Sequence, residues 1–128
     1  MEIEVGSKGK VVSYVEREDT DAEIGSGTLL VYSTACMVAL MEGAACEAIL
    51  DRLPPDKTTV STELILRHTS GTPVGLEVSA EATVTQNDKD VVTFSITVSD
   101  EAGIIAEATH KRRIVNSQRY LDKVYEKL

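Results

Sequence analysis

A carboxylate, an imidazole and a hydroxyl are the side chains of this sequence best suited to chemistry, and the carboxylate is the most unusual of them. Glu42 lies in the middle of an apolar stretch rich in Ala, Leu and Met. An unpaired carboxylate in such surroundings loses several kcal/mol of hydration free energy, so something must offset that cost. A desolvated carboxylate can act as a nucleophile or general base near neutral pH. The alternative is a structural glutamate that reaches a solvent edge or pairs with an arginine.

His68 and Thr34 are the imidazole and the hydroxyl. His68 alternates with Leu64 and Leu66, so we expect its ring on the core side of a strand. A lone histidine there is more often structural, and a partner such as Glu42 would make it a proton shuttle. Thr34 follows Ser33 at a predicted helix start, where its simplest role is an N-cap. Its alternative role is to position substrate beside helix N–H groups that favour an oxyanion.

Lower-ranked candidates are a cysteine and a basic run. Cys36 lies near the same helix start, but the sequence offers it no evident base. The run from His110 to Arg113, with Arg67 and Arg119, is either a phosphate contact or a solvated strand end. Cys36 and Cys46 are about 15 Å apart on one helix, beyond the reach of a disulfide. The Cys and His spacing indicates no metal site.

Length, composition and charge limit the classes of protein to which this chain can belong. With 128 residues and 42% hydrophobic content, the chain predicts one domain over residues 1–128. A net charge of −8 argues against nucleic acid as a partner. No apolar run approaches the ~18 residues that cross a bilayer, so we expect neither a membrane span nor a signal peptide. Unbridged cysteines favour a cytoplasmic location.

The elements that position these residues follow from hydrophobic periodicity. A buried helix is predicted over residues 34–52, ending before Pro54 and Pro55. Strand-like alternation marks residues 10–16, 58–68, 76–86, 91–99 and 104–115, and residues 117–128 form a short amphipathic helix that we expect to dock on the domain. In residues 58–68 the alternation places one set inward (Thr58, Val60, Thr62, Leu64, Leu66, His68) and another outward (Thr59, Ser61, Glu63, Arg67).

This order of elements predicts an α+β hot-dog fold, in which an antiparallel sheet wraps around one long central helix. Turns at residues 87–90 and 100–103 indicate successive hairpins, hence an antiparallel meander. A ferredoxin-like fold is the alternative. It requires a second long helix between strands, and residues 56–116 contain no helical pattern.

Three residues and one turn carry a family resemblance. Thr34, Glu42 eight positions later and His68 twenty-six positions further, followed by the turn Thr72–Gly75, resemble the fluoroacetyl-CoA thioesterase-like family of hot-dog proteins from about Val5 to Val115. The resemblance implies an acyl-CoA thioesterase whose catalytic triad is Thr34, Glu42 and His68. It implies that Arg112 helps to hold the coenzyme A moiety, and that no cofactor is needed beyond the thioester substrate.

Two neighbours and one loop refine this interpretation. We assign Ser33 and Gly75, which flank the predicted catalytic residues, to substrate binding together with Arg112. The family member specialised for fluoroacetyl groups carries phenylalanines in a lid ahead of the helix. The matching stretch here, residues 24–30, has no aromatic residue, which argues against fluorine selectivity.

Helix geometry bears on the oligomeric state. Eight residues place Thr34 and Glu42 about 12 Å apart on a straight helix, too far for one triad. Either Thr34 lies in a curl ahead of the helix, or the site is composite across a two-fold axis. We therefore predict a homodimer, and the sequence leaves open whether dimers pair into a tetramer. Two other functions stay open: a non-catalytic module that binds acyl-CoA or another small molecule, and a purely structural dimerisation domain.

Overall fold

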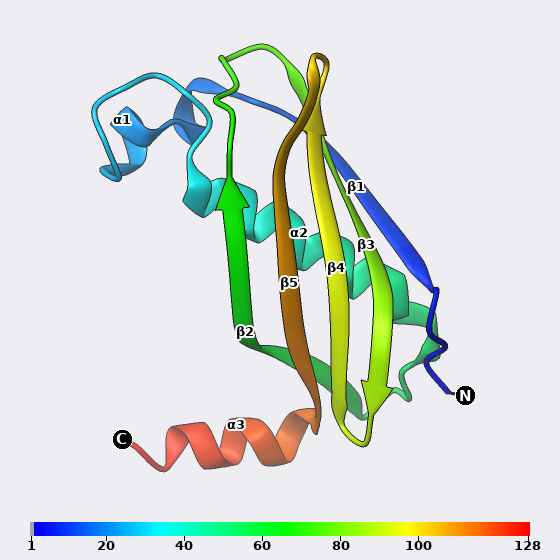
Figure 1. The fold of residues 1–128 in the computed structure, drawn as a ribbon. Coiled ribbons are helices and arrows are strands. Elements are labelled where there is room, and N and C mark those ends of the chain that lie inside the picture. Colours follow the sequence, from blue (N-terminus) through cyan, green and yellow to red (C-terminus); the bar gives the residue numbers. More distant parts are fainter. Residues whose placement is uncertain (1) are drawn as a thin grey trace.

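Five antiparallel strands and one long helix form the body of the computed structural model, which describes residues 2–128 (Figure 1). The sheet has the order β1-β3-β4-β5-β2, and every pairing in it is antiparallel. The strands are β1 (Lys8–Tyr14), β2 (Lys57–His68), β3 (Glu77–Asp88), β4 (Val91–Asp100) and β5 (Gly103–Asn116). The helix α2 (Thr34–Ile49) crosses the inner face of the sheet. This arrangement confirms the predicted α+β class.

The helix α2 is buried because its sequence is apolar on most sides. Its fully or nearly buried residues are Met37, Leu40, Met41, Ala44, Ala45, Ala48 and Ile49. The Ser33 hydroxyl accepts a hydrogen bond from the Cys36 amide and caps the helix start. At the other end the chain tightens into a 3-10 turn, η2 (Leu50–Arg52), ahead of Pro54 and Pro55. The predicted helix over residues 34–52 is thus an α-helix followed by this turn.

Strand β1 approaches α2 so closely that only glycine fits at one position. A Cβ atom added to Gly9 would overlap the backbone of Ala44 and Ala48. Glycine is the residue that permits such close backbone approach. On the other strands the inward side chains fill the space below the helix, with Phe94, Ile96 and Val98 of β4 almost completely buried.

Strand β2 contains a bulge that the sequence pattern did not reveal. Its register against β5 shifts between Ser61 and Glu63, which leaves Thr62 as the extra residue. Thr59 therefore pairs with Ile114 and Ser61 with Arg112, and both lie on the inward face of the sheet. The alternation had predicted Thr59 and Ser61 on the outward face. Beyond the bulge, Leu64, Leu66 and His68 face inward as predicted. The error arose because the prediction assumed that side chains alternate without interruption. One extra residue moves every residue on one side of it to the opposite face.

The segments outside the sheet differ from expectation in two places. Ahead of α2, where no helix was predicted, the chain forms a 3-10 turn, η1 (Arg17–Asp19), and a short helix, α1 (Asp21–Ile24). The predicted C-terminal helix forms as α3 (Ser117–Tyr125) but runs away from the sheet instead of docking its apolar side on it (Figure 1). Its apolar residues stay exposed, for example Tyr125 at 63%. Docking is therefore wrong for a single chain.

Two negative observations hold for residues 2–128. Between residues 56 and 116 the chain forms strands and turns and no helix, which excludes the ferredoxin-like alternative. Over the same described residues, the structure contains no helix with the length and apolar character needed to cross a membrane.

Candidate active site

Thr34 and His68 meet where α2 begins and β2 ends. The Oγ1 atom of Thr34 lies 2.8 Å from Nδ1 of His68, within hydrogen-bond distance. Thr34 is the first residue of α2 and is exposed, whereas His68 is the last residue of β2 and is half-buried. Ser33, not Thr34, caps the helix. The N-cap interpretation of Thr34 is therefore wrong, and its hydroxyl is left to pair with the imidazole.

The second nitrogen of His68 has no hydrogen-bond partner among residues 2–128. The Nε2 atom is buried and makes no hydrogen bond to any of residues 2–128. Such buried, unpaired polar atoms are uncommon in proteins and call for an explanation. A neutral imidazole at this point can accept a proton or donate one, depending on its tautomer. Within residues 2–128, Nε2 of His68 is therefore free to form a further hydrogen bond.

Backbone donors at the start of α2 lie beside this pair. Ser33 satisfies the amides of Cys36, through its side chain, and of Met37, through its carbonyl. The amides of Thr34 and Ala35 have no acceptor within the described part of the chain, as expected for the first turn of a helix. These N–H groups and the positive end of the helix dipole favour a developing negative charge.

The turn Thr72–Gly75 supports this helix start from the side. The amide of Tyr32, two residues before Thr34, donates to the carbonyl oxygen of Thr72 at 2.8 Å. The hydroxyl of Thr72, which is fully buried, donates to Asp100 Oδ2 at 2.7 Å, and this bond lowers the pKa of Asp100. The turn therefore ties the start of α2 to the end of β4.

Ser33 and Gly75, both predicted to bind substrate, make structural hydrogen bonds in this chain. Ser33 is fully buried and its hydroxyl serves as the helix cap. Gly75 has a φ of +100°, which favours glycine, and its amide donates to the Val15 carbonyl oxygen at 2.8 Å. Both residues thus hold the loops around Thr34, and no observation assigns them to a ligand.

Glu42 lies farther along α2 and pairs with an arginine. Its Oε2 is 3.6 Å from Nη1 of Arg112, and its side chain is 33% exposed. Because Thr34 belongs to the α-helix itself, helix geometry separates it from Glu42 by about 12 Å. The curl considered ahead of the helix is therefore excluded. Within one chain the structure brings Thr34 and His68 together, and Glu42 forms no hydrogen bond with either of them.

Strand alternation splits the basic run between the two faces of the sheet. His110 is fully buried and Arg112 is 8% exposed, both on the inward face of β5. Lys111 pairs with Glu63 at 3.9 Å, and Arg113 lines a hollow of about 510 Å³ with Arg119 and other residues beside α3. The run is therefore not one basic patch, and its two buried inward members form a cluster with the partly exposed Glu42.

Thr59 was missed as a functional candidate, and His110 was considered only as a member of the basic run. Thr59 accepts hydrogen bonds from Arg112 through both its hydroxyl, at 2.9 Å, and its carbonyl oxygen, at 3.1 Å. His110 accepts from Arg112 Nη1 through Nε2 at 3.2 Å. The spacing of His110 and Arg112, two residues apart on one strand face, was a usable signal. Thr59 gave none, because the bulge reverses its predicted direction.

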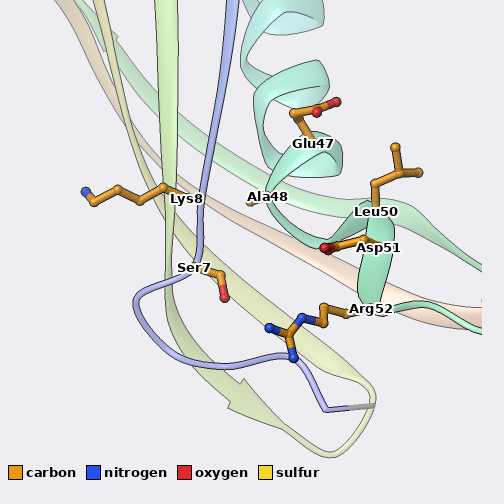
Figure 2. Close-up of a pocket in the computed structure, with 7 residues that line it drawn as sticks. All are labelled: Ser7, Lys8, Glu47, Ala48, Leu50, Asp51 and Arg52. Carbon is orange, nitrogen blue, oxygen red and sulfur yellow. The ribbon is translucent and has the colours of Figure 1, made fainter.

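A separate hollow of about 400 Å³ lies at the far end of α2 (Figure 2). It is lined by Ser7, Lys8, Glu47, Ala48, Leu50, Asp51 and Arg52. Its two acidic and two basic side chains carry opposite charges that offset each other. It lies at the C-terminal end of the helix, remote from Thr34, so we do not assign the chemistry to it.

Comparisons with known proteins identify the family of this chain. Residues 10–118 match the sequence family described as fluoroacetyl-CoA-specific thioesterase. A fluoroacetyl-CoA thioesterase from Streptantibioticus cattleyicolor is 29% identical over 97 residues, which cover 76% of this chain and 70% of that protein.

Solved structures share the fold over nearly the full chain. A structure of the fluoroacetyl-CoA thioesterase FlK superposes with a TM-score of 0.94 and 24% identity, covering 100% of this chain and 99% of that one. A hot-dog-like protein from Thermanaerovibrio acidaminovorans gives a TM-score of 0.88 and 24% identity, covering 97% and 92% of the two chains. The predicted hot-dog fold and the family resemblance are confirmed.

Proposed function

We propose that this chain, which belongs to the fluoroacetyl-CoA-specific thioesterase family and is an acyl-CoA thioesterase, removes short acyl groups from coenzyme A at a site that uses Thr34, Glu42 and His68. The observation that supports this site most directly is the 2.8 Å contact of Thr34 with His68 at the start of α2. Beside it lie an unpaired imidazole nitrogen and two free helix amides. These are the groups that acyl transfer requires.

The reaction adds water across the thioester bond. Glu42 either attacks the carbonyl carbon itself or removes a proton from an attacking water. The carbonyl oxygen becomes an oxyanion, which the Thr34 hydroxyl and the amides of Thr34 and Ala35 stabilise. When the carbon–sulfur bond breaks, His68 delivers a proton to the departing thiolate. If Glu42 attacks directly, the acyl group then remains on Glu42 as a mixed anhydride, and water hydrolyses it in a second step. In both routes the products are a carboxylic acid and coenzyme A. No cofactor or metal takes part in this scheme.

The site is proposed to be completed by a second copy of the chain. Strand β2 is an edge strand of 12 residues, and edge strands expose unpaired backbone groups that can pair with another chain. It ends at His68, and Glu42 is partly open to solvent while lying too far from Thr34 within one chain. A dimer through β2 would place the two sets of groups from neighbouring chains side by side, giving two equivalent sites.

Size measurements test the assembly. Gel filtration with light scattering at micromolar concentration should give the mass of a dimer, or of a tetramer if dimers pair. A monomer under these conditions would contradict the composite site, although it would leave the fold intact.

Three narrower proposals accompany this function. We place the enzyme in the cytoplasm, because Cys36 and Cys46 are free thiols. We also propose that residues 1–128 form one domain, because a chain of this length supports one hydrophobic core. We expect no preference for fluorinated acyl groups, because residues 24–30 ahead of α2 contain no aromatic side chain. Comparing kcat/KM for acetyl-CoA and fluoroacetyl-CoA tests this expectation, and a strong preference for the fluorinated ester would refute it.

Thiol release from acetyl-CoA and longer acyl-CoA esters tests the catalytic assignment. Glu42→Ala and His68→Ala should each lower the rate by about 10²- to 10⁴-fold, the usual contribution of a general acid or base. Near wild-type rates in both variants would refute the assignment. Saturable binding of acyl-CoA without any thiol release in the wild type would instead identify a non-catalytic binding module.

A further inference from the structure

Arg112 carries a positive charge that is held almost entirely out of water. Its side chain is 9% exposed, and its guanidinium lies between β2, β5 and α2. Arginine is seldom this buried unless it is paired and hydrogen-bonded, because desolvation of the cation is costly. A coenzyme A phosphate outside the protein would need the guanidinium to face outward. The burial of Arg112 therefore indicates a role inside the site.

Three contacts fix the orientation of this guanidinium. Nε donates to Thr59 Oγ1 at 2.9 Å, Nη2 donates to the Thr59 carbonyl oxygen at 3.1 Å, and Nη1 donates to His110 Nε2 at 3.2 Å. A planar group that donates a hydrogen bond from each of its three nitrogens has one orientation. The same Nη1 lies 3.6 Å from Glu42 Oε2, so the carboxylate faces a cation whose position is already set.

His110 is fixed as an acceptor for Arg112. Its Nδ1 lies 2.8 Å from the Glu63 carbonyl oxygen, which can only accept, so Nδ1 must carry the hydrogen. Arg112 can only donate, so Nε2 must offer a lone pair. Burial is the main cause that lowers the pKa of His110, and the charge of Arg112 lowers it further against the opposing Glu63 hydrogen bond. The ring is thus neutral and in a single tautomer.

The bulge in β2 places the groups that hold the Arg112 guanidinium. Thr59 precedes the register shift and the Glu63 carbonyl follows it, and together they flank Arg112 and His110. Bulges are frequent near active sites, where they redirect side chains. Here the bulge turns Thr59 inward and leaves the Glu63 carbonyl oxygen on His110.

We infer that Arg112, His110 and Thr59 are positioning residues: His110 and Thr59 hold the guanidinium, and the guanidinium holds the Glu42 carboxylate in its reactive direction. This inference rests on the proposed role of Glu42. It assigns Arg112 to the Glu42 carboxylate in place of the coenzyme A moiety, which the family resemblance implies as its partner.

Two substrates separate the two roles of Arg112. Acetyl-CoA carries the nucleotide and its phosphates, whereas S-acetyl-N-acetylcysteamine carries the same thioester without them. Arg112→Gln and His110→Asn should each lower kcat by about 10²-fold with both substrates, the loss expected from a misplacement of about 1 Å. Their KM values should stay roughly unchanged. The adjacent exposed arginine gives the matched control, and Arg113→Gln should keep the wild-type kcat.

A milder variant covers the case in which His110→Asn does not fold. Thr59→Val removes only the hydroxyl that accepts from Arg112 Nε and keeps the size of the side chain. It should lower kcat in the same direction and by a smaller factor, with KM unchanged for both substrates. A wild-type kcat in folded Thr59→Val and Arg112→Gln would overturn the inference. So would a rise in KM confined to acetyl-CoA in Arg112→Gln, which would identify a coenzyme A contact.

A double-mutant cycle distinguishes positioning from a general structural role. If His110 acts only through Glu42, adding His110→Asn to Glu42→Gln should cause no further loss of kcat. Independent losses that multiply would show that His110 supports the fold in general, and would overturn the inference. A wild-type kcat in Glu42→Gln alone would overturn the proposed function itself. The two failures therefore give different results.

Discussion

The two histidines of this chain occupy opposite environments. His68 lies half-buried at the end of β2, bonds an exposed threonine and leaves Nε2 without a partner. His110 is fully buried in the middle of β5, uses both ring nitrogens and packs its ring against Phe94 with 5.9 Å between centroids. An unpaired buried nitrogen costs stability, and satisfied polar networks rigidify a core. The comparison teaches that His68 is suited to chemistry and His110 to holding other groups in place.

Replacing His68 gives the largest expected effect and tests this contrast directly. His68→Ala should lower kcat by about 10²- to 10⁴-fold. Its free energy of unfolding should change by less than about 1 kcal/mol, because the variant also removes a buried unsatisfied atom. Thiol release and urea unfolding measure the two quantities. A large loss of stability without loss of activity would reverse the roles of the two histidines.

Removing the Thr34 hydroxyl should cause the second-largest loss of activity. Thr34→Val keeps the shape of the side chain and removes the group that bonds His68, so kcat should fall by about 10²-fold, as for one oxyanion donor. Thr34→Ser keeps the hydroxyl and serves as the control, with activity near that of the wild type. Equal activity of the valine and serine variants would show that the contact with His68 has no catalytic role.

A substitution of Thr72 tests how far Thr34 and His68 depend on the turn Thr72–Gly75. Thr72→Val leaves Asp100 without its hydroxyl donor, and loss of a buried hydrogen bond to a charged group costs about 1–3 kcal/mol of unfolding free energy. Because the same turn bonds Tyr32 just ahead of α2, some loss of kcat should accompany it. Thermal unfolding and thiol release measure the two effects. Unchanged stability would show that the bond to Asp100 contributes nothing.

The pH dependence of stability gives the smallest and most specific signal. The pKa of His110 is lowered from 6.5, mainly by burial, so the unfolded chain binds a proton before the folded chain does. Stability is therefore full above pH 6.5 and falls as pH decreases toward the folded pKa. Urea unfolding between pH 8 and pH 5 should show this fall in the wild type, as measured at constant ionic strength. His110→Asn, where it folds, should flatten it, and an equal fall in the variant would assign the dependence to another group.

Asp100 makes stability depend on pH in a second, more acidic range. Its pKa is lowered from 3.8, chiefly by the Thr72 hydroxyl, so its contribution is present above that pH and is lost as pH falls through the folded pKa. Thr72→Val should reduce the acid sensitivity in this range and leave the fall associated with His110 unchanged. This separation tells the two groups apart.

Most of the fold followed from periodicity because local and global preferences agree in this chain. The apolar run from Thr34 ended at Pro54 and Pro55, so the helix was predicted within a few residues of its observed end. The hairpin turns placed β3, β4 and β5 nearly correctly. The α3 helix was predicted as well, but its docking was not settled by its pattern. An amphipathic pattern indicates an apolar side without indicating what covers it.

The site was less accessible to sequence reasoning. Periodicity placed His68 inward, and the resemblance grouped it with Thr34 and Glu42, but neither showed which pairs touch within one chain. The inward direction of Arg112 follows from strand alternation only once the register of β5 is known. Thr59 was assigned to the wrong face because a bulge depends on the partner strand, and one extra residue leaves no mark in the composition. The sequence also did not show that Ser33, and not Thr34, caps the helix, because both are good N-cap residues and helix ends are predicted only to within one or two residues.

The bulge at Thr62 also constrains how this sequence can vary. Thr59 and His68 face the same side of the sheet although nine positions separate them, an odd number that unbroken pleating forbids. Deleting Thr62 would leave an interval of eight, so a regular strand would then keep both side chains on the face that α2 covers. An odd interval between these two residues therefore requires a bulge and an even interval requires a regular strand, so a one-residue insertion or deletion here is tolerated only if the bulge appears or disappears with it.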